Sequence, residues 1–160
     1  MPREGPKAIL LTHGHFDHIG AVISLRNHYN IPVYASKNEV PLLLDASLNL
    51  SQMVNGHYSI EVDETINDND TLELIGMKIK CMLTPGHTSG SMCYLIQDCL
   101  FSGDTLFEES YGRVDFPTGS LIDLKKSIKK LLLLDENTKV YPGHGNVTSI
   151  LHEKNHNPLK

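Results

Sequence analysis

Ligand-type side chains gather in one short segment near the start of the chain. Within six positions this segment holds four residues whose side chains can bind metals: His13, His15, Asp17 and His18. Neutral imidazole and carboxylate are the usual nitrogen and oxygen ligands of zinc and related divalent ions. A group this dense is rare by chance, so the segment predicts a metal site.

Three later ligand-type residues each follow a short apolar run: His87, Asp104 and His144. Both of these histidines come directly after a Pro-Gly pair. Such a pair suits a tight turn, because proline presets one dihedral angle and glycine accepts positive φ. The first segment also follows an apolar run, at residues 8–12. Loops at the ends of neighbouring strands converge, so we predict that all seven side chains meet.

Seven ligands are too many for one tetrahedral zinc ion, which takes four. They suit two ions that share a carboxylate and lie about 3.5–4 Å apart, as in metal-assisted hydrolases. The expected division is three ligands for each ion and one bridge: His13, His15 and His87 at the first ion, Asp17, His18 and His144 at the second, and Asp104 between them. Zinc is the expected metal, with iron and manganese as alternatives.

Apolar runs bounded by turn residues predict that mixed strands and helices position these ligands. The expected strands are residues 8–12, 31–35, 71–75, 78–83, 92–96, 99–102 and 139–141. Residues 71–83 and 92–102 are each expected to form a hairpin. Helices are expected from residue 21, after Ser36, after Ser120 and over residues 149–154. Residues 45–70 are expected to be loop with an edge element.

Two of the expected helices carry a capping signal. Glu39 stands at the capping-box position after Ser36, and Asp123 at the same position after Ser120. Helical spacing predicts an apolar stripe in two helices, formed by Val22, Leu25 and Tyr29 in one and by Leu121, Leu124, Ile128 and Leu131 in the other. The lysines of the second helix are expected to face solvent: Lys125, Lys126, Lys129 and Lys130.

Length and composition restrict the class of protein. One hundred and sixty residues suit a single domain over residues 1–160. The net charge of −5, from 14 basic and 19 acidic residues, argues against a nucleic-acid partner. No apolar run approaches the length of a membrane span, and the first residues lack an apolar signal core. The three cysteines have no CxxC spacing, so we expect no disulfide and a cytoplasmic protein.

Four segments resemble the motifs of the metallo-β-lactamase superfamily. Residues 12–18 resemble its THxHxDH signature, and the later motifs follow in the same order at residues 84–91, 101–107 and 141–145. Residues 112–117 and 153–158 narrow the resemblance to short, glyoxalase-II-like hydrolases. The resemblance implies an α/β (α+β) fold, the αββα sandwich of this superfamily.

Members of this superfamily carry several strands before the THxHxDH signature, whereas the signature strand here begins almost at Met1. The expected sandwich is therefore incomplete at its N-terminal side. An uncovered sheet edge and core face favour association, so a homo-oligomer is also expected.

The resemblance also implies an activity, the metal-dependent hydrolysis of a small-molecule thioester of the hydroxyacylglutathione type. A hydroxide held between two metal ions would attack the carbonyl carbon, and Asp17 would orient this nucleophile. The thiolate would leave without strong acid help, because thiol pKa values lie near about 8.5. Arg113 is a candidate for binding a substrate carboxylate, although it could instead pair with Asp115. Tyr111 and Tyr141 are candidates for lining the pocket.

Two other functions stay open at this point. The first is a persulfide dioxygenase with a single iron, held in that family by residues that match His13, His87 and Asp104. The second is a metal-binding module without catalysis. A β-lactamase is less favoured, because no export signal is present and Asp104 stands where some lactamases carry cysteine. The remaining histidines are expected at the surface: His28, His57, His152 and His156.

Overall fold

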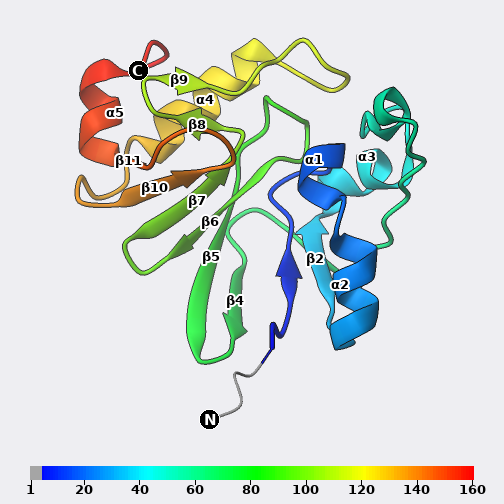
Figure 1. Ribbon diagram of the computed structural model, residues 1–160. Coiled ribbons are helices and arrows are strands. Elements are labelled where there is room, and N and C mark those ends of the chain that lie inside the picture. Colours follow the sequence, from blue (N-terminus) through cyan, green and yellow to red (C-terminus); the bar gives the residue numbers. More distant parts are fainter. Residues whose placement is uncertain (1–4) are drawn as a thin grey trace.

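Two β-sheets face each other in this protein, and helices cover the outer side of each (Figure 1). The computed structural model describes residues 5–160. Between the sheets lies an apolar layer that includes Ile66 from the smaller sheet and Ile79, Met92 and Tyr94 from the larger one. The order of layers is therefore α, β, β, α, as the resemblance of the motifs implies.

The smaller sheet is parallel, with strand order β1-β2-β3, and it comes from the first part of the chain. Its strands are β1 (Ile9–Leu10), β2 (Val33–Ser36) and β3 (Glu64–Ile66). Short helices accompany it: α1 (Phe16–Ile19), α2 (Val22–Tyr29), η1 (Lys37–Glu39), α3 (Val40–Leu44) and η2 (Ser51–Val54). Ile19, Val22 and Leu43 pack from these helices onto Val33 and Ala35, which closes the outer face of this sheet.

The larger sheet has the strand order β11-β10-β7-β6-β5-β4. Its strands are β4 (Thr71–Leu74), β5 (Met77–Leu83), β6 (Met92–Ile96), β7 (Cys99–Gly103), β10 (Lys139–Pro142) and β11 (Thr148–Ser149). Cys81 pairs with Tyr94 across the antiparallel β5 and β6, and Leu100 pairs with Val140 across the parallel β7 and β10. A separate hairpin joins β8 (Leu106–Phe107) to β9 (Ser110–Tyr111).

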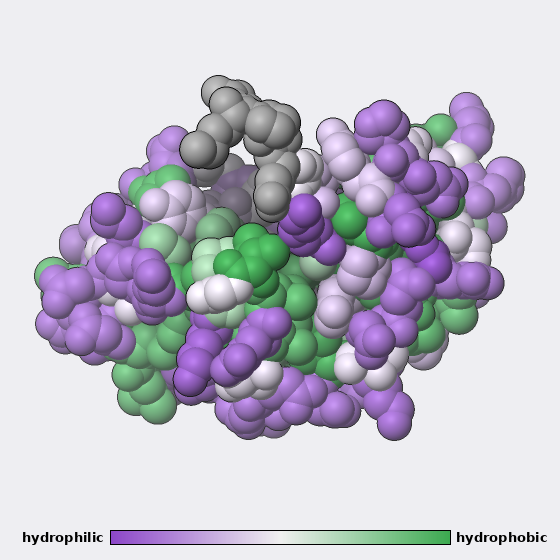
Figure 2. Space-filling model, turned by 90° about the horizontal axis from the view of Figure 1, so that it is seen from below, coloured by the Kyte–Doolittle hydropathy of each residue, from purple (hydrophilic) through white to green (hydrophobic). Residues whose placement is uncertain are grey.

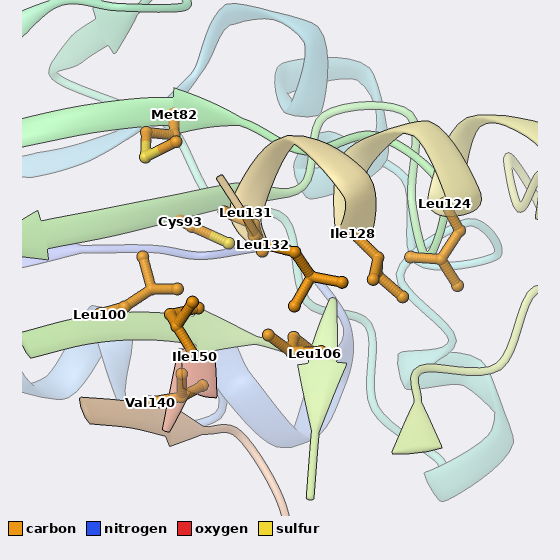
Figure 3. Packing of buried hydrophobic residues seen from close by; sticks show 10 residues of the cluster. All are labelled: Met82, Cys93, Leu100, Leu106, Leu124, Ile128, Leu131, Leu132, Val140 and Ile150. Atoms are coloured by element: carbon orange, nitrogen blue, oxygen red, sulfur yellow. The ribbon is translucent and has the colours of Figure 1, made fainter. Parts of the chain in front are cut away.

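Helix α4 (Leu121–Leu131) packs on the outer face of the larger sheet, beside α5 (Ile150–His156). Leu124, Ile128 and Leu131 point from α4 into a cluster with Leu100 and Val140 of the sheet (Figure 3). The Asp123 backbone N–H donates a hydrogen bond to the Ser120 hydroxyl, which itself donates to the Asp123 carboxylate. The predicted start of this helix is confirmed.

Several details of the predicted helices are wrong. Leu121 is 48% exposed, because the stripe that meets the sheet begins one turn later, at Leu124. Leu25 and Tyr29 of α2 are also exposed, so only Val22 of that predicted stripe is buried. Lys130 is half-buried rather than solvated, since its Nζ donates to the Asp68 carboxylate and to the backbone oxygen of Leu83.

Each predicted strand has an observed counterpart whose limits differ by at most two residues, and the strand predicted at residues 31–35 is observed at Val33–Ser36. Only Ile9 and Leu10 of residues 8–12 form a strand. The edge element expected within residues 45–70 is β3. The β8–β9 hairpin had no predicted counterpart, because two-residue strands carry no alternating pattern.

The topology brings four loops to one end of the molecule. Strands β5 and β7 both run antiparallel to β6, and β10 runs parallel to β7. The carboxyl ends of these three strands therefore lie at the same edge of the larger sheet. The segment after β1 reaches that edge as well, because the Met92 backbone N–H donates to the Thr12 backbone oxygen over 2.8 Å.

The opposite end of the molecule, which carries the turn between β4 and β5, contains a mainly apolar groove. This groove has a volume of about 450 Å³, and its lining includes Leu10, Ile75, Met77 and Phe101. Ile75 is 67% exposed and Phe101 is 42% exposed. Figure 2 shows apolar surface in the middle of this face. None of the described helices is long and apolar enough to cross a membrane.

We predict that Ile128→Ala lowers the free energy of unfolding by about 2–5 kcal/mol, because it leaves a cavity between α4 and the larger sheet. Ile122→Ala on the exposed side of the same helix should change it by less than about 0.5 kcal/mol. Ile122 is 72% exposed and Ile128 is fully buried. Urea unfolding at a fixed zinc concentration measures both values. Equal losses would show that α4 does not pack as described.

Candidate metal centre

All seven ligand-type residues singled out in the sequence lie in one cluster, and five of them line a single pocket: His15, Asp17, His87, Asp104 and His144. His13 and His15 lie between β1 and α1, and Asp17 and His18 lie within α1. The other three follow the carboxyl ends of β5, β7 and β10, and they are His87, Asp104 and His144. The pocket has a volume of about 440 Å³, and aromatic side chains form part of its wall, among them Phe107, Tyr111 and Phe116.

Three buried histidines form the first group of donor atoms. One nitrogen from each of His13, His15 and His87 lies within 4.8 Å of the others. The His15 Nδ1 and the His87 Nε2 are 2.9 Å apart. The His13 ring centroid lies 4.9 Å from that of His15 and 4.7 Å from that of His87. Each of these three side chains is at most 3% exposed.

A second group lies nearer to solvent and contains Asp17, His18 and His144. The Nε2 of His144 is 3.2 Å from Oδ2 of Asp17, and the Nε2 of His18 is 3.7 Å from the same oxygen. The Asp104 carboxylate faces both groups. Its Oδ2 lies 3.6 Å from Nε2 of His87 and 3.6 Å from Nε2 of His144, and its Oδ1 lies 3.4 Å from Nε2 of His18. Donor atoms of His13, His18 and Asp104 also lie within 4.8 Å of one another, so the two groups adjoin at Asp104. The division of the ligands between two ions stays a prediction.

Four buried donor atoms in this cluster have no hydrogen-bond partner among residues 5–160. They are Nε2 of His13, of His15 and of His18, and Oδ1 of Asp104. Leaving a buried polar atom unpaired costs about 1–3 kcal/mol. Divalent cations in the cluster would satisfy Nε2 of His13 and of His18 and Oδ1 of Asp104, because neutral imidazole and carboxylate are their ordinary ligands. His15 faces the cluster with its other ring nitrogen, Nδ1. The donor set therefore fits a metal centre.

Burial and mutual repulsion lower the pKa of three of the imidazoles, those of His13, His15 and His18. Burial lowers the pKa of His13 well below its usual value, and the neighbouring histidines lower it further. Burial likewise lowers the pKa of His15 to about 4 and lowers that of His18. Burial raises the pKa of Asp104, and the three surrounding histidines oppose that rise. Neutral imidazole is the form that binds a metal, so these histidines are ready to act as ligands at neutral pH.

Two glycines let the loops approach closely, each for a different reason. Gly86, before His87, has φ +143°, and a Cβ there would lie 2.3 Å from Cα of Leu124. Gly143, before His144, does not have the positive φ expected from the sequence. A Cβ at Gly143 would instead lie 2.2 Å from Oδ1 of Asp104 and 2.8 Å from Cε1 of His18. This second glycine is therefore required for space at the carboxylate.

Glu39 is the site residue that the sequence analysis missed. Its expected role in a capping box after Ser36 is wrong, because the Ser36 hydroxyl caps Asn38 and the Glu39 side chain turns inward. Its Oε1 accepts a 2.8 Å hydrogen bond from the Gly14 backbone N–H. Its Oε2 accepts from the Thr88 hydroxyl at 2.9 Å and from the Gly90 N–H at 3.0 Å. Glu39 thus ties the first histidine loop to the loop that carries His87.

Burial raises the pKa of Glu39, while the three hydrogen bonds that it accepts oppose this rise. A carboxylate that accepts three hydrogen bonds in a buried setting holds its donors in place. Only a local signal, the spacing from Ser36, marked this residue in the sequence. That signal indicated a helix cap. The partners of Glu39 lie 25, 49 and 51 positions away in the sequence, and contacts at such separations leave no local pattern.

Arg113 contributes to the centre through its backbone. The Nδ1 of His87 donates a 2.7 Å hydrogen bond to the Arg113 carbonyl, which fixes the orientation of the ring and leaves Nε2 as its lone-pair atom. The Arg113 guanidinium donates two hydrogen bonds to Asp115, at 2.6 and 2.5 Å, and lies 3.9 Å from the centroid of the Phe116 ring. These hydrogen bonds lower the pKa of Asp115 to about 2.

The other candidate residues lie at different places. Tyr111 lines the pocket, whereas Tyr141 stacks on Phe101 with ring centroids 5.4 Å apart. Tyr141 does not belong to the residues that line this pocket. His28, His57 and His156 are exposed and His152 is half-buried, and none of the four belongs to the pocket lining.

Comparison with known proteins identifies the family of the chain. The family model described as the metallo-beta-lactamase superfamily matches residues 1–144. The chain belongs to this superfamily. Its αββα fold is therefore confirmed, and the superfamily binds divalent metals, in agreement with the histidine clusters described above.

Two relatives are named as hydrolases. The chain is 44% identical to the "Probable metallo-hydrolase YqgX" of Bacillus subtilis, over 96% of this chain and 75% of the relative. It is 36% identical to the "Hydroxyacylglutathione hydrolase GloC" of Haemophilus influenzae, again over 96% of this chain and 75% of the relative. These similarities support its assignment as a metal-dependent hydrolase of the superfamily.

Solved structures are similar over nearly the whole chain. The BLEG-1 B3 metallo-beta-lactamase matches with a TM-score of 0.90 and 42% identity, over 96% of this chain and 76% of that one. TTHA1623, in a di-iron-bound form, matches with a TM-score of 0.85 and 34% identity, over 98% of this chain and 78% of that one. ETHE1 from Myxococcus xanthus matches with a TM-score of 0.78 and 32% identity, over 95% of this chain and 61% of that one.

We predict that Glu39→Gln weakens metal binding by about 10–100-fold, because an amide cannot accept all three hydrogen bonds and the histidine loops lose their common anchor. Unfolding should also become easier by about 1–3 kcal/mol. Competition with a chelator measures the first effect and urea unfolding the second. The exposed Glu64, changed to Gln, serves as the control and should alter neither. Unchanged metal affinity in Glu39→Gln would contradict the anchoring role.

We predict that acid destabilises the metal-free protein between pH 6.5 and about 4. Histidine in the unfolded chain takes up its proton near pH 6.5, whereas His15 in the folded chain does so near 4 and the pKa of His13 is also depressed. In this window the unfolded state binds more protons, so the free energy of unfolding falls as the pH falls. Urea unfolding of chelator-treated protein at several pH values measures the slope.

His15→Gln should make this slope shallower, because one of the depressed groups is removed. His57→Gln, at an exposed position, is the matched control and should leave the slope as it is. A free energy of unfolding that does not change between pH 6.5 and 4.5 would contradict the prediction.

Proposed function

We propose that this protein is a hydrolase for small-molecule thioesters that works with two divalent metal ions, zinc being the expected metal. The proposed ligands are the seven residues around the pocket: His13, His15 and His87 for one ion, Asp17, His18 and His144 for the other, and Asp104 between them. The observation that carries the proposal is the Asp104 carboxylate, which faces both groups of donor atoms. A carboxylate in that position suits a pair of ions rather than one.

When bound, such ions lower the pKa of a water molecule toward neutrality and polarise a carbonyl oxygen. The protein itself positions the reactants. Asp17 is the proposed catalytic residue, because its side chain lies at the pocket and is 40% exposed, so its carboxylate can orient an attacking water. His87 is held by the Arg113 carbonyl, and this hydrogen bond keeps its ring nitrogen aimed at the centre.

The pocket favours a leaving group that departs without a proton. Every imidazole and carboxylate in its lining belongs to the proposed ligand set: His15, Asp17, His87, Asp104 and His144. These groups are therefore not free to act as a general acid. A thiolate leaves readily because thiol pKa values lie near about 8.5, far below those of alcohols. The similarity to a relative named hydroxyacylglutathione hydrolase is a second, independent support for a thioester substrate.

Arg113 is the proposed residue for a substrate carboxylate. It lines the pocket, and its side chain is 57% exposed. In the free protein its guanidinium already binds Asp115, so a substrate carboxylate would have to replace that partner. Water and salt screen an exposed ion pair and keep it weak, so the exchange is within reach of an ordinary charged substrate.

The experiment is a turnover assay of the metal-loaded protein on a panel of thioesters that includes hydroxyacylglutathione thioesters. We expect turnover well above that of free metal ions, and removal of the metal by a chelator should abolish it. Asp17→Asn should lower kcat by about 10²–10⁴-fold, as is typical when a group that orients or accepts a proton is lost. Metal content, measured on the same samples, separates loss of an ion from loss of orientation.

Asp98→Asn, in the turn between β6 and β7, is the matched control and should keep full activity. The proposal is contradicted if protein that demonstrably holds its ions hydrolyses none of the thioesters. The panel also contains a β-lactam, because one similar structure is that of a metallo-beta-lactamase.

A persulfide dioxygenase with one iron is the second candidate. The observation in its favour is that His13, His87 and Asp104 come together: the rings of His13 and His87 lie 4.7 Å apart, and Nε2 of His87 is 3.6 Å from Oδ2 of Asp104. One iron per chain, with oxygen consumed in the presence of a persulfide, would identify this activity. Two ions per chain, with no activity on any substrate, would identify a metal-binding module.

A further inference from the structure

A second cluster of metal-ligand side chains lies outside the pocket. It contains Glu109, in the turn between β8 and β9, together with His152 and His156 of α5. One donor atom from each of the three residues lies within 4.8 Å of the others. None of these residues belongs to the proposed catalytic ligand set or to the pocket lining. The cluster is therefore a separate feature that the proposed activity does not explain.

A buried carboxylate holds the turn of Glu109 against α5. Glu109 has φ +50°, an uncommon conformation for a residue with a side chain. Its backbone N–H donates a 3.0 Å hydrogen bond to Oε2 of Glu153. Glu153 is fully buried and also accepts from the Thr148 hydroxyl at 2.6 Å and from the Asn157 amide at 3.0 Å. Because of this anchor, the Glu109 side chain is placed beside His152.

The two histidines lie one turn apart on α5 and share one face of the helix. Their rings stack with centroids 4.3 Å apart and an interplanar angle of 22°. The Nδ1 of His156 lies 3.0 Å from the His152 backbone oxygen, so it carries the proton and leaves Nε2 as the lone-pair atom. Metal-binding histidines commonly use their other ring nitrogen in this way, as a donor to a backbone carbonyl.

The spacing of the donor atoms is close to what a small divalent ion requires. Zinc binds imidazole nitrogen and carboxylate oxygen at about 2.0–2.2 Å, which puts two ligands of a tetrahedral site about 3.4 Å apart. Nε2 of His152 and Oε1 of Glu109 are already 3.0 Å apart. The side chains of His152 and Glu109 are 36% and 58% exposed, so an ion can reach them directly from solvent.

We propose that Glu109, His152 and His156 form a second divalent-metal site, of the type that binds zinc, nickel or copper, on the surface of the protein. A water molecule from the solvent completes the coordination. Two imidazoles and one carboxylate suit these borderline ions better than calcium or magnesium, which prefer oxygen ligands. The bound ion fastens the β8–β9 hairpin to α5. Because Phe107, Ser110 and Tyr111 of this hairpin line the pocket, the ion also stiffens one wall of the catalytic site.

The test uses the full chain with its catalytic centre loaded and excess metal removed. Zinc chloride is then titrated into this protein and the heat of binding is measured. We expect one additional ion per chain. His152→Gln and His156→Gln should each weaken its binding by at least about tenfold, because even the loss of an outer partner of a ligand costs 10–100-fold. His28→Gln, at an exposed position on α2, is the matched control and should bind as the wild type does.

Thermal unfolding provides a second readout that does not depend on turnover. Added zinc should raise the Tm of the loaded wild-type protein, and the double variant His152→Gln/His156→Gln should lose this rise while keeping the Tm of the loaded wild type without added zinc. The proposal is overturned if the loaded wild type takes up no additional ion, which would mean an ion pair of His152 with Glu109 only. It is equally overturned if the double variant takes up the ion with wild-type affinity. Neither result depends on which reaction the pocket catalyses.

Discussion

The centre of this protein rests on one constraint, the burial of polar ligand atoms that have no hydrogen-bond partner among the described residues. His13, His15 and His18 each keep a ring nitrogen without a partner, and Asp104 keeps a carboxylate oxygen. Such atoms cost free energy unless an ion binds them. The same burial lowers the pKa of His13 and of His15. At neutral pH these histidines therefore stay unprotonated, and protonation does not offset the free-energy cost of the unpaired atoms. The surrounding structure must hold these side chains together before any ion is bound.

Three features outside the ligand set meet that demand. The apolar layers on both faces of the sheets fix the strands from which the loops leave. Glu39 joins the loop of Gly14 to the loop of Thr88 and Gly90. The carbonyl of Arg113 orients His87. Each of these acts on the position of a ligand rather than on the reacting groups, so the chemistry of the pocket depends on residues that do not touch a substrate.

Much of the fold and the site could be predicted from the sequence, because the signals are local. His13, His15, Asp17 and His18 lie within six positions, and the other ligand-type residues follow apolar runs. The structure places the seven side chains in one cluster, and five of them line the same pocket. Most strands also follow from short apolar runs and turn residues, whereas the layer order was implied only by the resemblance of the motifs to a known superfamily.

The remaining features depend on contacts between distant parts of the chain. Glu39 matches the spacing of a capping box, but its partners lie in loops that only the folded chain brings near. Gly143 follows proline as in a turn, yet the reason for glycine is the Asp104 carboxylate beside it. Leu121 has helical spacing but lies before the helix reaches the sheet. Periodicity identifies a face of a helix and does not say where along its length that face is covered.

The distribution of the ligands along the chain has a consequence for the order of folding. His13 and His15 follow a strand of the smaller sheet, whereas three other ligands follow strands of the larger one: His87, Asp104 and His144. A complete set of donors therefore arises only after both sheets have docked and the late strand β10 has joined β7. An ion that needs the whole set binds the assembled state and not its parts. Such an ion therefore stabilises the protein only after the two sheets have docked, and it slows their separation.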